Sequence, residues 1–316
     1  MTVLNNYKDE ILSYLKIIGF KKKIKSRISS CYVCNKKEYT VLREKSWIAK
    51  KEYSFLPVVI CNCCGALRQL VEFEKKFYSE YYKKIYSKIT KIWHANNSLD
   101  TYFDSQIKRG NILYQNINKY FKNKKDLKLL DVGCGPGGMM TPFIQNNWSC
   151  IGIENSDEHC NYGKKMGIPL KKIDAENFYD KKSKFDLIVI IGSLEHVYNP
   201  NKVMENCKKM IKRGGYLLLE GKGKIINHST KFFNHNHHRI FSRNSIQLMM
   251  LKYNFEPIFT TFKQICGSFK GSNLYCFGKF SGKKKITFKQ RILSLKDSPN
   301  NIINKYNLHD FKIRKR

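Results

Sequence analysis

Hydrophobic positions in the middle of the chain form short apolar runs that alternate with stretches of helical pattern. The run at 185–191 is nearly continuous, which predicts a strand buried on both of its faces. Alternation of strands with helices of this length is typical of a doubly wound α/β sheet. The expected strands are 129–132, 151–154, 170–174, 185–191, 216–219, 256–261 and 274–280, and the expected helices are 110–121, 139–146, 201–211 and 245–252.

The first of these strands leads directly into a glycine-rich segment, Asp-Val-Gly-Cys-Gly-Pro-Gly-Gly at 131–138. Glycines at this point allow the backbone to approach a ligand at the carboxyl edge of a parallel sheet. Gly133, Gly135 and Gly138 satisfy a Gly-x-Gly-x-x-Gly spacing, which by itself fits a dinucleotide, a flavin or S-adenosylmethionine. Asp131 favours the last of these, because a carboxylate before the first glycine suits an ammonium group better than a pyrophosphate.

Acidic residues also end the next two strands. Glu154 follows the glycines by about twenty residues, where a carboxylate can accept hydrogen bonds from both ribose hydroxyls. Asp174 ends the third strand and is placed to accept from an adenine amino group. The fourth strand opens into Gly-Ser-Leu-Glu-His-Val at 192–197. A lone acid is more often a solvated surface residue. The glycine-rich segment, Glu154, Asp174 and the segment at 192–197 occur in this order, however, and together they make the prediction specific.

These residues resemble the class I S-adenosylmethionine-dependent methyltransferases, in particular the branch with an acid-His pair after the fourth strand. The resemblance covers roughly 111–280 and implies a Rossmann-like seven-stranded sheet whose last strand is antiparallel. The alternative is a cofactor-binding scaffold without activity. The presence of Asp131, Glu154 and Asp174 argues against it. The cofactor site implied by the resemblance is lined by Asp131, Gly133, Gly135, Gly137, Glu154, Asp174, Ala175 and the backbone of Ser193 and Leu194.

Two Cys-x-x-Cys pairs precede this region, Cys31 with Cys34 and Cys61 with Cys64. Four thiolates on two tight turns can bind one tetrahedral Zn²⁺ at about 2.3 Å, and the residues between the pairs are expected to form a small ribbon hairpin. Four protein ligands close the coordination sphere, so we expect a structural zinc site. Cys63 is an extra thiol that could replace Cys61 or Cys64. The cysteines expected to be packing residues are Cys134, Cys150, Cys160, Cys207, Cys266 and Cys276.

An aromatic segment at 77–86 follows the second cysteine pair. The order of ribbon, aromatic segment and core resembles bacterial methyltransferases found with sugar and surface-polysaccharide biosynthesis genes, including the zinc-ribbon sugar methyltransferases. That resemblance implies that Tyr78 and Tyr82 lie near the cofactor, although aromatic residues packed in a core fit the same spacing. The expected domains are an N-terminal helix and zinc ribbon at 1–70, an aromatic helical lid at 71–110, the methyltransferase core at 111–281 and a basic tail at 282–316.

Histidines are the candidate proton acceptors. Sulfonium methyl transfer is an in-line displacement that requires the nucleophile to be held about 3 to 3.5 Å from the methyl carbon. A sugar hydroxyl must also lose its proton, and His is the usual acceptor near neutral pH. His196 is the first candidate, with His237 and His238 as further ones. The alternative for His196 is a turn residue bonded to the backbone, and Glu195 is expected to face the cofactor or cap the turn.

The net charge of +34 raises the question of a nucleic-acid partner. The Lys excess is spread over the whole chain, which argues against specific nucleic-acid binding. The resemblance carried by the order of ribbon, aromatic segment and core implies instead a small-molecule methyltransferase acting on a nucleotide-linked sugar or glycan intermediate of surface-polysaccharide biosynthesis. An RNA methyltransferase is the alternative, favoured by the cysteine pairs, the aromatic residues and the charge. Against this alternative, the sequence contains no Asn-Pro-Pro-aromatic motif for methylation of base amino groups and no Pro-Cys nucleophile for pyrimidine carbon. The acceptor atom and the oligomeric state stay open.

The two ends of the chain carry weaker patterns. Residues 11–20 predict a short amphipathic helix, expected to pack on the domain, which lacks the features of a signal peptide. No stretch of 18 apolar residues occurs, so we expect no transmembrane segment and a cytoplasmic location. The Lys-rich tail is expected to be solvated and partly helical.

Overall fold

The structure, a computed structural model, describes residues 8–17, 19–20, 24–48, 52–82, 98–223, 238–267, 273–282 and 298–304. They belong to two compact units. The second unit comprises 96–224 and 245–292, and the first comprises 1–95, 225–244 and 293–316. The predicted domain boundaries stay a prediction; of the described residues outside the N-terminal part, 238–244 and 298–304 belong to the first unit.

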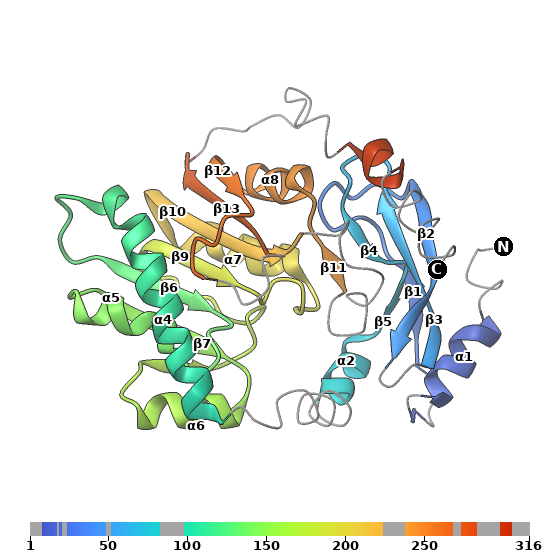
Figure 1. Cartoon of the computed structure of the whole chain (residues 1–316), viewed down its shortest axis with the longest axis horizontal. Coiled ribbons are helices and arrows are strands. Elements are labelled where there is room, and N and C mark those ends of the chain that lie inside the picture. The colour runs from blue at the N-terminus through green and yellow to red at the C-terminus, as the bar shows by residue number, and fades with distance from the viewer. Residues whose placement is uncertain are drawn as a thin grey trace. The chain divides into compact units, whose positions relative to one another are not determined.

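A seven-stranded sheet forms the second unit, in the order β12-β13-β10-β9-β6-β7-β8 (Figure 1). The five strands from β6 to β10 are parallel, while β13 runs antiparallel to both of its neighbours. The expected sheet with an antiparallel last strand is therefore confirmed. The bounds are β6 Lys128–Val132, β7 Ser149–Glu154, β8 Leu170–Lys172, β9 Phe185–Ile191, β10 Ile211–Lys222, β12 Phe255–Thr261 and β13 Asn273–Phe280.

Helices α4, α5 and α6 cover one face of this sheet, and α7 and α8 cover the other (Figure 1). Helix α4 begins at Leu99 rather than at the predicted Gly110, because Oγ of Ser98 caps it by accepting the N–H of Thr101 at 3.2 Å. The bounds are α4 Leu99–Ile117, η4 Asn118–Phe121, η5 Gly138–Met140, α5 Thr141–Gln145, α6 Asp157–Lys165, α7 Pro200–Met210 and α8 Arg243–Lys252.

Strand β10 begins earlier than predicted. The predicted helix at 201–211 and strand at 216–219 leave Gly214 and Gly215 between them, but α7 ends at Met210 and both glycines lie within β10. They fall where the register with β9 shifts between Ile211 and Tyr216, and Gly214 has a φ of +73°. The glycines therefore allow an irregularity within β10 and do not terminate a helix.

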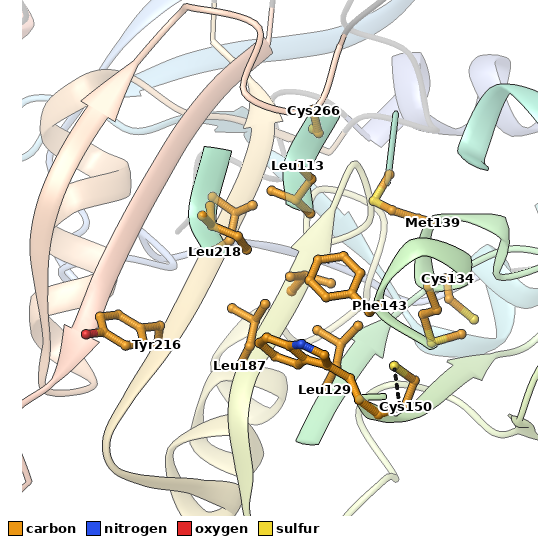
Figure 2. Close-up of a cluster of buried hydrophobic side chains, with 14 of the residues drawn as sticks. Leu113, Leu129, Cys134, Met139, Phe143, Cys150, Leu187, Tyr216, Leu218 and Cys266 are labelled. Carbon is orange, nitrogen blue, oxygen red and sulfur yellow. Dashed lines mark hydrogen bonds between the residues drawn. The ribbon is translucent and has the colours of Figure 1, made fainter. Parts of the chain in front are cut away.

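One face of the sheet packs against α4 and α5. Figure 2 shows Leu129, Leu187 and Leu218 from three strands facing Leu113 of α4 and Phe143 of α5. The neighbours in β9, including Ile188, are also buried, and because strand side chains alternate they occupy the other face. β9 is thus buried on both faces, as predicted. The six cysteines expected to pack in apolar surroundings are all buried.

The first unit contains a four-stranded sheet in the order β11-β4-β3-β2 and a separate pair formed by β1 and β5. β2 and β3 are an antiparallel hairpin between the two cysteine pairs, which confirms the predicted hairpin. The bounds are α1 Lys8–Ile17, β1 Ser26–Ile28, β2 Tyr39–Ile48, β3 Glu52–Cys61, β4 Leu67–Gln69, β5 Val71–Phe73, α2 Lys75–Tyr81 and β11 Arg239–Ile240.

Both chain ends contribute to the packing of the first unit. Helix α1 buries Ile11 and Leu15, as expected of an amphipathic helix packed on the domain. The described part of the tail is helical at 299–304, where Ile302 is 4% exposed and packs against Val58, Ile60, Leu67 and Ile240. The tail is therefore partly helical, as predicted, but Ile302 is buried rather than solvated. None of the helices within the described residues is long and apolar enough to cross a membrane.

Candidate functional site

The carboxyl ends of β6, β7 and β9 meet at one edge of the seven-stranded sheet. Asp131 of β6 lies opposite Gly152 of β7 on one side and Val189 of β9 on the other. Beyond the strand, Gly133 donates its N–H to the carbonyl of Ile153 at 2.9 Å. Parallel alignment therefore brings the segments that follow the three strands to one edge, where ligands of such sheets bind.

The glycine-rich segment requires glycine for two separate reasons. Gly133 and Gly137 have φ angles of +73° and +83°, a region that other residues rarely adopt. A Cβ on Gly133 would lie 2.6 Å from Cβ of Ser193, and one on Gly137 would lie 2.7 Å from Ile168. Oγ of Ser193 in turn donates to the carbonyl of Val132 at 2.7 Å. The segment is thus packed tightly against its neighbours.

Glu154 is fixed by three backbone donors. Its Oε2 accepts the N–H of Gly135 at 3.0 Å, and its Oε1 accepts those of Asn155 and Ser156, both at 2.8 Å. Hydrogen bonds to a carboxylate are stronger than those between neutral groups. The half-buried acid is therefore held at the end of β7, in contact with the glycine-rich segment.

Asp131 is a buried acid at the same edge, 3% exposed. Burial, and to a smaller extent the charge of Glu154, raises its pKa from 3.8 to about 7, and the charge of Arg109 opposes this shift. A cationic group placed beside such a carboxyl would restore its charged form. The residue therefore fits the ammonium group that the sequence led us to expect.

The remaining predicted cofactor residues follow β8 and β9. Ile173 donates its N–H to the carbonyl of Glu154 at 2.9 Å, which places the half-buried Asp174 and Ala175 at the same edge. The Asp174 carbonyl accepts the N–H groups of Asn177 and Phe178, so a tight turn follows β8. After β9, Ser193 is half-buried and Leu194 is buried.

Gln106 of α4 is a site residue that the sequence analysis missed. Its Nε2 donates to the carbonyl of Cys134 at 3.0 Å, and its Oε1 accepts the N–H of Gly138 at 3.0 Å. The same Nε2 lies 3.4 Å from the hydroxyl of Tyr102, within hydrogen-bonding distance. A buried carboxamide thus holds the glycine-rich segment at two points. One feature of the sequence could have identified it. Gln106 is a polar residue on a helix face whose other residues, Phe103 and Leu113, are apolar.

The turn after β9 contains the acid-His pair. His196 is half-buried and donates its backbone N–H to the carbonyl of Ser193 at 3.0 Å. Glu195 is 1% exposed, and its Oε2 has no hydrogen-bond partner in the part of the chain that the structure describes. Burial raises the pKa of Glu195 to about 7. The two neighbours therefore differ, one being accessible and the other enclosed.

A buried ion pair joins α4 to β10. Nη2 of Arg109 donates to Oε2 of Glu220 at 2.9 Å, and its Nε donates to the carbonyl of Gly267 at 2.9 Å. Glu220 also accepts hydrogen bonds from Cys266, at 3.2 Å, and from Asn273. The sequence analysis missed this network, because its members are far apart in the chain and belong to no motif.

The four predicted metal ligands come together in the first unit. Sγ of Cys31 lies 3.5 Å from that of Cys64, the Cys34 and Cys61 sulfurs are also 3.5 Å apart, and all four lie within 4.8 Å of one another. These distances exclude disulfides, whose S–S length is about 2.05 Å. A tetrahedron with metal–sulfur bonds of about 2.3 Å has sulfur separations near 3.8 Å, so the cluster fits Zn²⁺. Cys63 is exposed and lies outside the cluster.

The aromatic and histidine candidates of the first unit are placed as follows. Tyr78 is buried, its hydroxyl accepts the N–H of Phe73 at 3.2 Å, and its ring lies 4.2 Å from that of the buried His238. Tyr82 is half-buried beside Tyr81, and His237 lies outside the described residues. The contacts of Tyr78 are those of a core residue. Its expected place near a cofactor stays a prediction.

Similarity to known proteins was found over part of the chain. Residues 103–259 match the family profile described as a methyltransferase domain. Over 160 residues, 46% of this chain, the sequence is 29% identical to the ubiquinone biosynthesis O-methyltransferase of Pelagibacter ubique. Over 99 residues, 29% of this chain, it is 28% identical to the protein of that name from Rhizobium etli. The aligned regions span 66% and 40% of these two relatives, less than two thirds of each.

The fold also matches solved structures. The plantazolicin methyltransferase BpumL, in complex with a triazolic desmethylPZN analog and SAH, superposes with a TM-score of 0.50 at 14% identity. The superposition covers 65% of this chain and 94% of that chain. At this level of identity the likeness shows the fold alone.

Proposed function

We propose, from the class I S-adenosylmethionine-dependent methyltransferase domain that this chain contains, that it methylates a hydroxyl of a nucleotide-linked sugar or glycan intermediate. The observation that carries the proposal is the bond from Gly135 to Glu154 beside the buried Asp131. Bound S-adenosylmethionine supplies an electrophilic methyl group on its sulfonium. In the proposed complex, Asp131 faces the ammonium group, Glu154 the ribose hydroxyls and Asp174 the adenine amino group.

An oxygen acceptor is supported by the curated relatives, because both are named as O-methyltransferases. The sugar or glycan class is supported by the chain order of four-cysteine ribbon, aromatic segment and methyltransferase domain. A hydroxyl of high pKa must lose its proton as it attacks the methyl carbon. The protein therefore needs a proton acceptor as well as a cofactor site.

We assign proton removal to His196, with His237 and His238 as further candidates. His196 follows β9 directly and stays partly accessible, whereas its neighbour Glu195 is enclosed. A neutral imidazole can take a proton near pH 7 without metal assistance. Replacing His196 by Ala is expected to lower kcat about 10²- to 10⁴-fold, with little change in the affinity for S-adenosylhomocysteine. A wild-type kcat in His196→Ala would remove His196 from this role.

The acceptor is tested with the full chain and S-adenosylmethionine carrying a labelled methyl group. The acceptors are nucleotide sugars, oligosaccharides, phenols and tRNA. We expect label in the sugar fractions, lost in Glu154→Gln and kept in Glu158→Gln, whose side chain is exposed on α6. Label in phenols alone would contradict the sugar class but retain the methyltransferase.

RNA is the second acceptor class, favoured by the net charge of +34. Binding through phosphate contacts loses affinity steeply as salt concentration rises. Labelled tRNA with a steep salt dependence, in the absence of labelled sugar, would replace the sugar proposal. Weak, salt-independent tRNA binding would exclude the RNA alternative.

We also propose that Cys31, Cys34, Cys61 and Cys64 bind one structural Zn²⁺. The proposal is supported by the mutual distances of the four thiols. Four protein ligands would leave no open position for water or substrate. Metal analysis of the purified chain is expected to give about one zinc per chain, lost in Cys34→Ser and retained in Cys63→Ser. Zinc retained in full by Cys34→Ser would contradict the assignment.

A further inference from the structure

A short strand in the first unit comes from the connection between β10 and α8 of the methyltransferase domain. This strand, β11, lies beside β4 in the ribbon sheet, with Arg239 opposite Arg68 and Ile240 opposite Leu67 (Figure 1). Gln69 donates its N–H to the carbonyl of His238 at 3.0 Å and extends the pairing. β11 is therefore held by the sheet that reaches the second cysteine pair, because β3 ends at Cys61 and Cys64 lies in the turn before β4.

The first cysteine pair contacts the same strand through Tyr32, which lies between Cys31 and Cys34. The Tyr32 hydroxyl donates to the carbonyl of Ile240 at 3.3 Å, and its ring meets Phe241 edge to face at 5.6 Å. The guanidinium of Arg239 lies 5.5 Å from the centre of the Tyr32 ring. Both cysteine pairs are thus connected to β11, one through Tyr32 and the other through β4.

Arg68 carries a buried positive charge in this region and is 3% exposed. Its Nη2 and Nε donate to the carbonyls of Ser29, at 2.7 Å, and Ser30, at 3.3 Å, the two residues before Cys31. Its Nη1 has no hydrogen-bond partner among the described residues, and none of its contacts there is with a carboxylate. A buried guanidinium is costly unless an anionic group compensates it. Four neutral thiols would not provide that charge, whereas four metal-bound thiolates would.

We propose that the metal-bound four-cysteine cluster is the anionic centre that Arg68 compensates, and that it fixes β11 in its place beside β4. The inference rests on the proposed zinc site. Connections that leave the carboxyl ends of strands contact the substrate in sheets of this kind. Bound metal would then hold the strand that leads into α8 of the methyltransferase domain.

The direct test is hydrogen exchange on the full chain before and after zinc removal with a chelator. The reporter is the Gln69 amide, which donates to His238 across the β4–β11 pair. We expect its exchange to become at least about tenfold faster without zinc, because the strand opens locally. The amides of Leu130 and Val189, in the middle of the methyltransferase sheet, serve as controls and are expected to keep their protection.

Metal analysis of the same samples separates the inference from the proposed zinc site. Zinc that is present and then removed, with unchanged exchange at Gln69, would overturn the inference and leave the zinc site intact. A purified chain that contains no zinc and takes up none would overturn the zinc site and, with it, the inference. Faster exchange of Gln69, Leu130 and Val189 together would also overturn it, since metal would then stabilise the whole chain.

Two substitutions test the individual contacts. Arg68→Gln is expected to weaken zinc binding about 10- to 100-fold, the usual effect of removing a partner of metal ligands. Arg27→Gln is the matched control, because Arg27 is exposed and paired with Glu72. Tyr32→Phe removes the hydrogen bond to Ile240 and is expected to speed exchange at Gln69 while zinc stays bound. Equal zinc affinity in Arg68→Gln and Arg27→Gln would contradict the assigned role of Arg68.

Discussion

The backbone N–H of Gly135 donates to Oε2 of Glu154 at 3.0 Å, a bond that joins the segments following β6 and β7. The other oxygen of the same carboxylate holds the start of the chain after β7, at Asn155 and Ser156. Two parts of the candidate cofactor site are therefore organised by one side chain. Preorganisation of this kind lowers the cost of ordering a site when a ligand binds.

The tight packing of Gly133 predicts a specific difference between two glycines. Gly133 and Gly192 both have positive φ angles, of +73° and +61°, but only a Cβ on Gly133 would meet another atom within 4 Å. Gly192→Ala is expected to cost about 1 kcal/mol through backbone strain. Gly133→Ala should cost about 1–3 kcal/mol more, because Cβ of Ser193 must move. Urea unfolding measures both values, and equal destabilisation would contradict the packing described here.

Gln106 should affect cofactor binding although no motif contains it. Gln106→Leu keeps the size of the side chain but leaves the Cys134 carbonyl and the Gly138 N–H without their partner. Each lost buried hydrogen bond costs about 1–3 kcal/mol. We expect weaker binding of S-adenosylhomocysteine and faster exchange of the Gly138 amide. Gln115→Leu, at an exposed position of the same helix, is the control. The same affinity in both variants would exclude a positioning role for Gln106.

The raised pKa of Asp131 predicts that ligand affinity depends on pH. In the free protein its carboxyl is half protonated at about pH 7. An ammonium group favours the carboxylate, so affinity for S-adenosylhomocysteine should fall as the pH drops below about 7. Binding at about pH 6.5 should therefore release a proton, detected by calorimetry in buffers of different ionisation enthalpy. Asp131→Asn is expected to abolish that release, and an unchanged release would place the titrating group elsewhere.

The same group should affect stability in the opposite direction. The folded protein holds a proton on Asp131 that the unfolded chain loses near pH 3.8. Stability from this group is therefore fully present at low pH and lost as the pH rises through about 7. Glu195, whose pKa is also about 7, acts in the same sense. Urea unfolding at several pH values should show a smaller decline in Asp131→Asn, and a still smaller one when Glu195→Gln is added.

The ion pair between Arg109 and Glu220 should show strong coupling. Arg109→Met leaves the buried Glu220 carboxylate without its cation and is expected to cost about 3–5 kcal/mol of unfolding free energy. Adding Glu220→Gln should cost much less than the sum of the single effects, because the uncompensated charge disappears. Urea unfolding of the four proteins in this double-mutant cycle gives the coupling. Additive effects would show that the pair makes no net contribution.

The strands and the acids at their ends could be predicted from the sequence because each depends on a local pattern. The run at 185–191 is buried on both faces as its composition indicates, and Glu154 lies beside the glycines that its spacing identifies. The four-cysteine cluster follows in the same way from two short motifs.

The parts that could not be predicted depend on contacts between distant residues. Gln106 and Arg109 contact residues that are far away in the sequence, and the local sequence of α4 does not indicate these partners. β11 contains two residues and has no periodicity to recognise. The start of α4 at Leu99 was missed although Ser98 is a preferred capping residue.

Calorimetric titration with S-adenosylhomocysteine of the wild type, Glu154→Gln and Glu158→Gln tests the central claim most directly. We predict that the wild type and the exposed control Glu158→Gln bind one molecule per chain with equal affinity. Glu154→Gln should bind at least about tenfold more weakly, a difference of about 1.4 kcal/mol. A folded wild-type chain that binds no S-adenosylhomocysteine, or a Glu154→Gln variant of unchanged affinity, would contradict the proposed cofactor site.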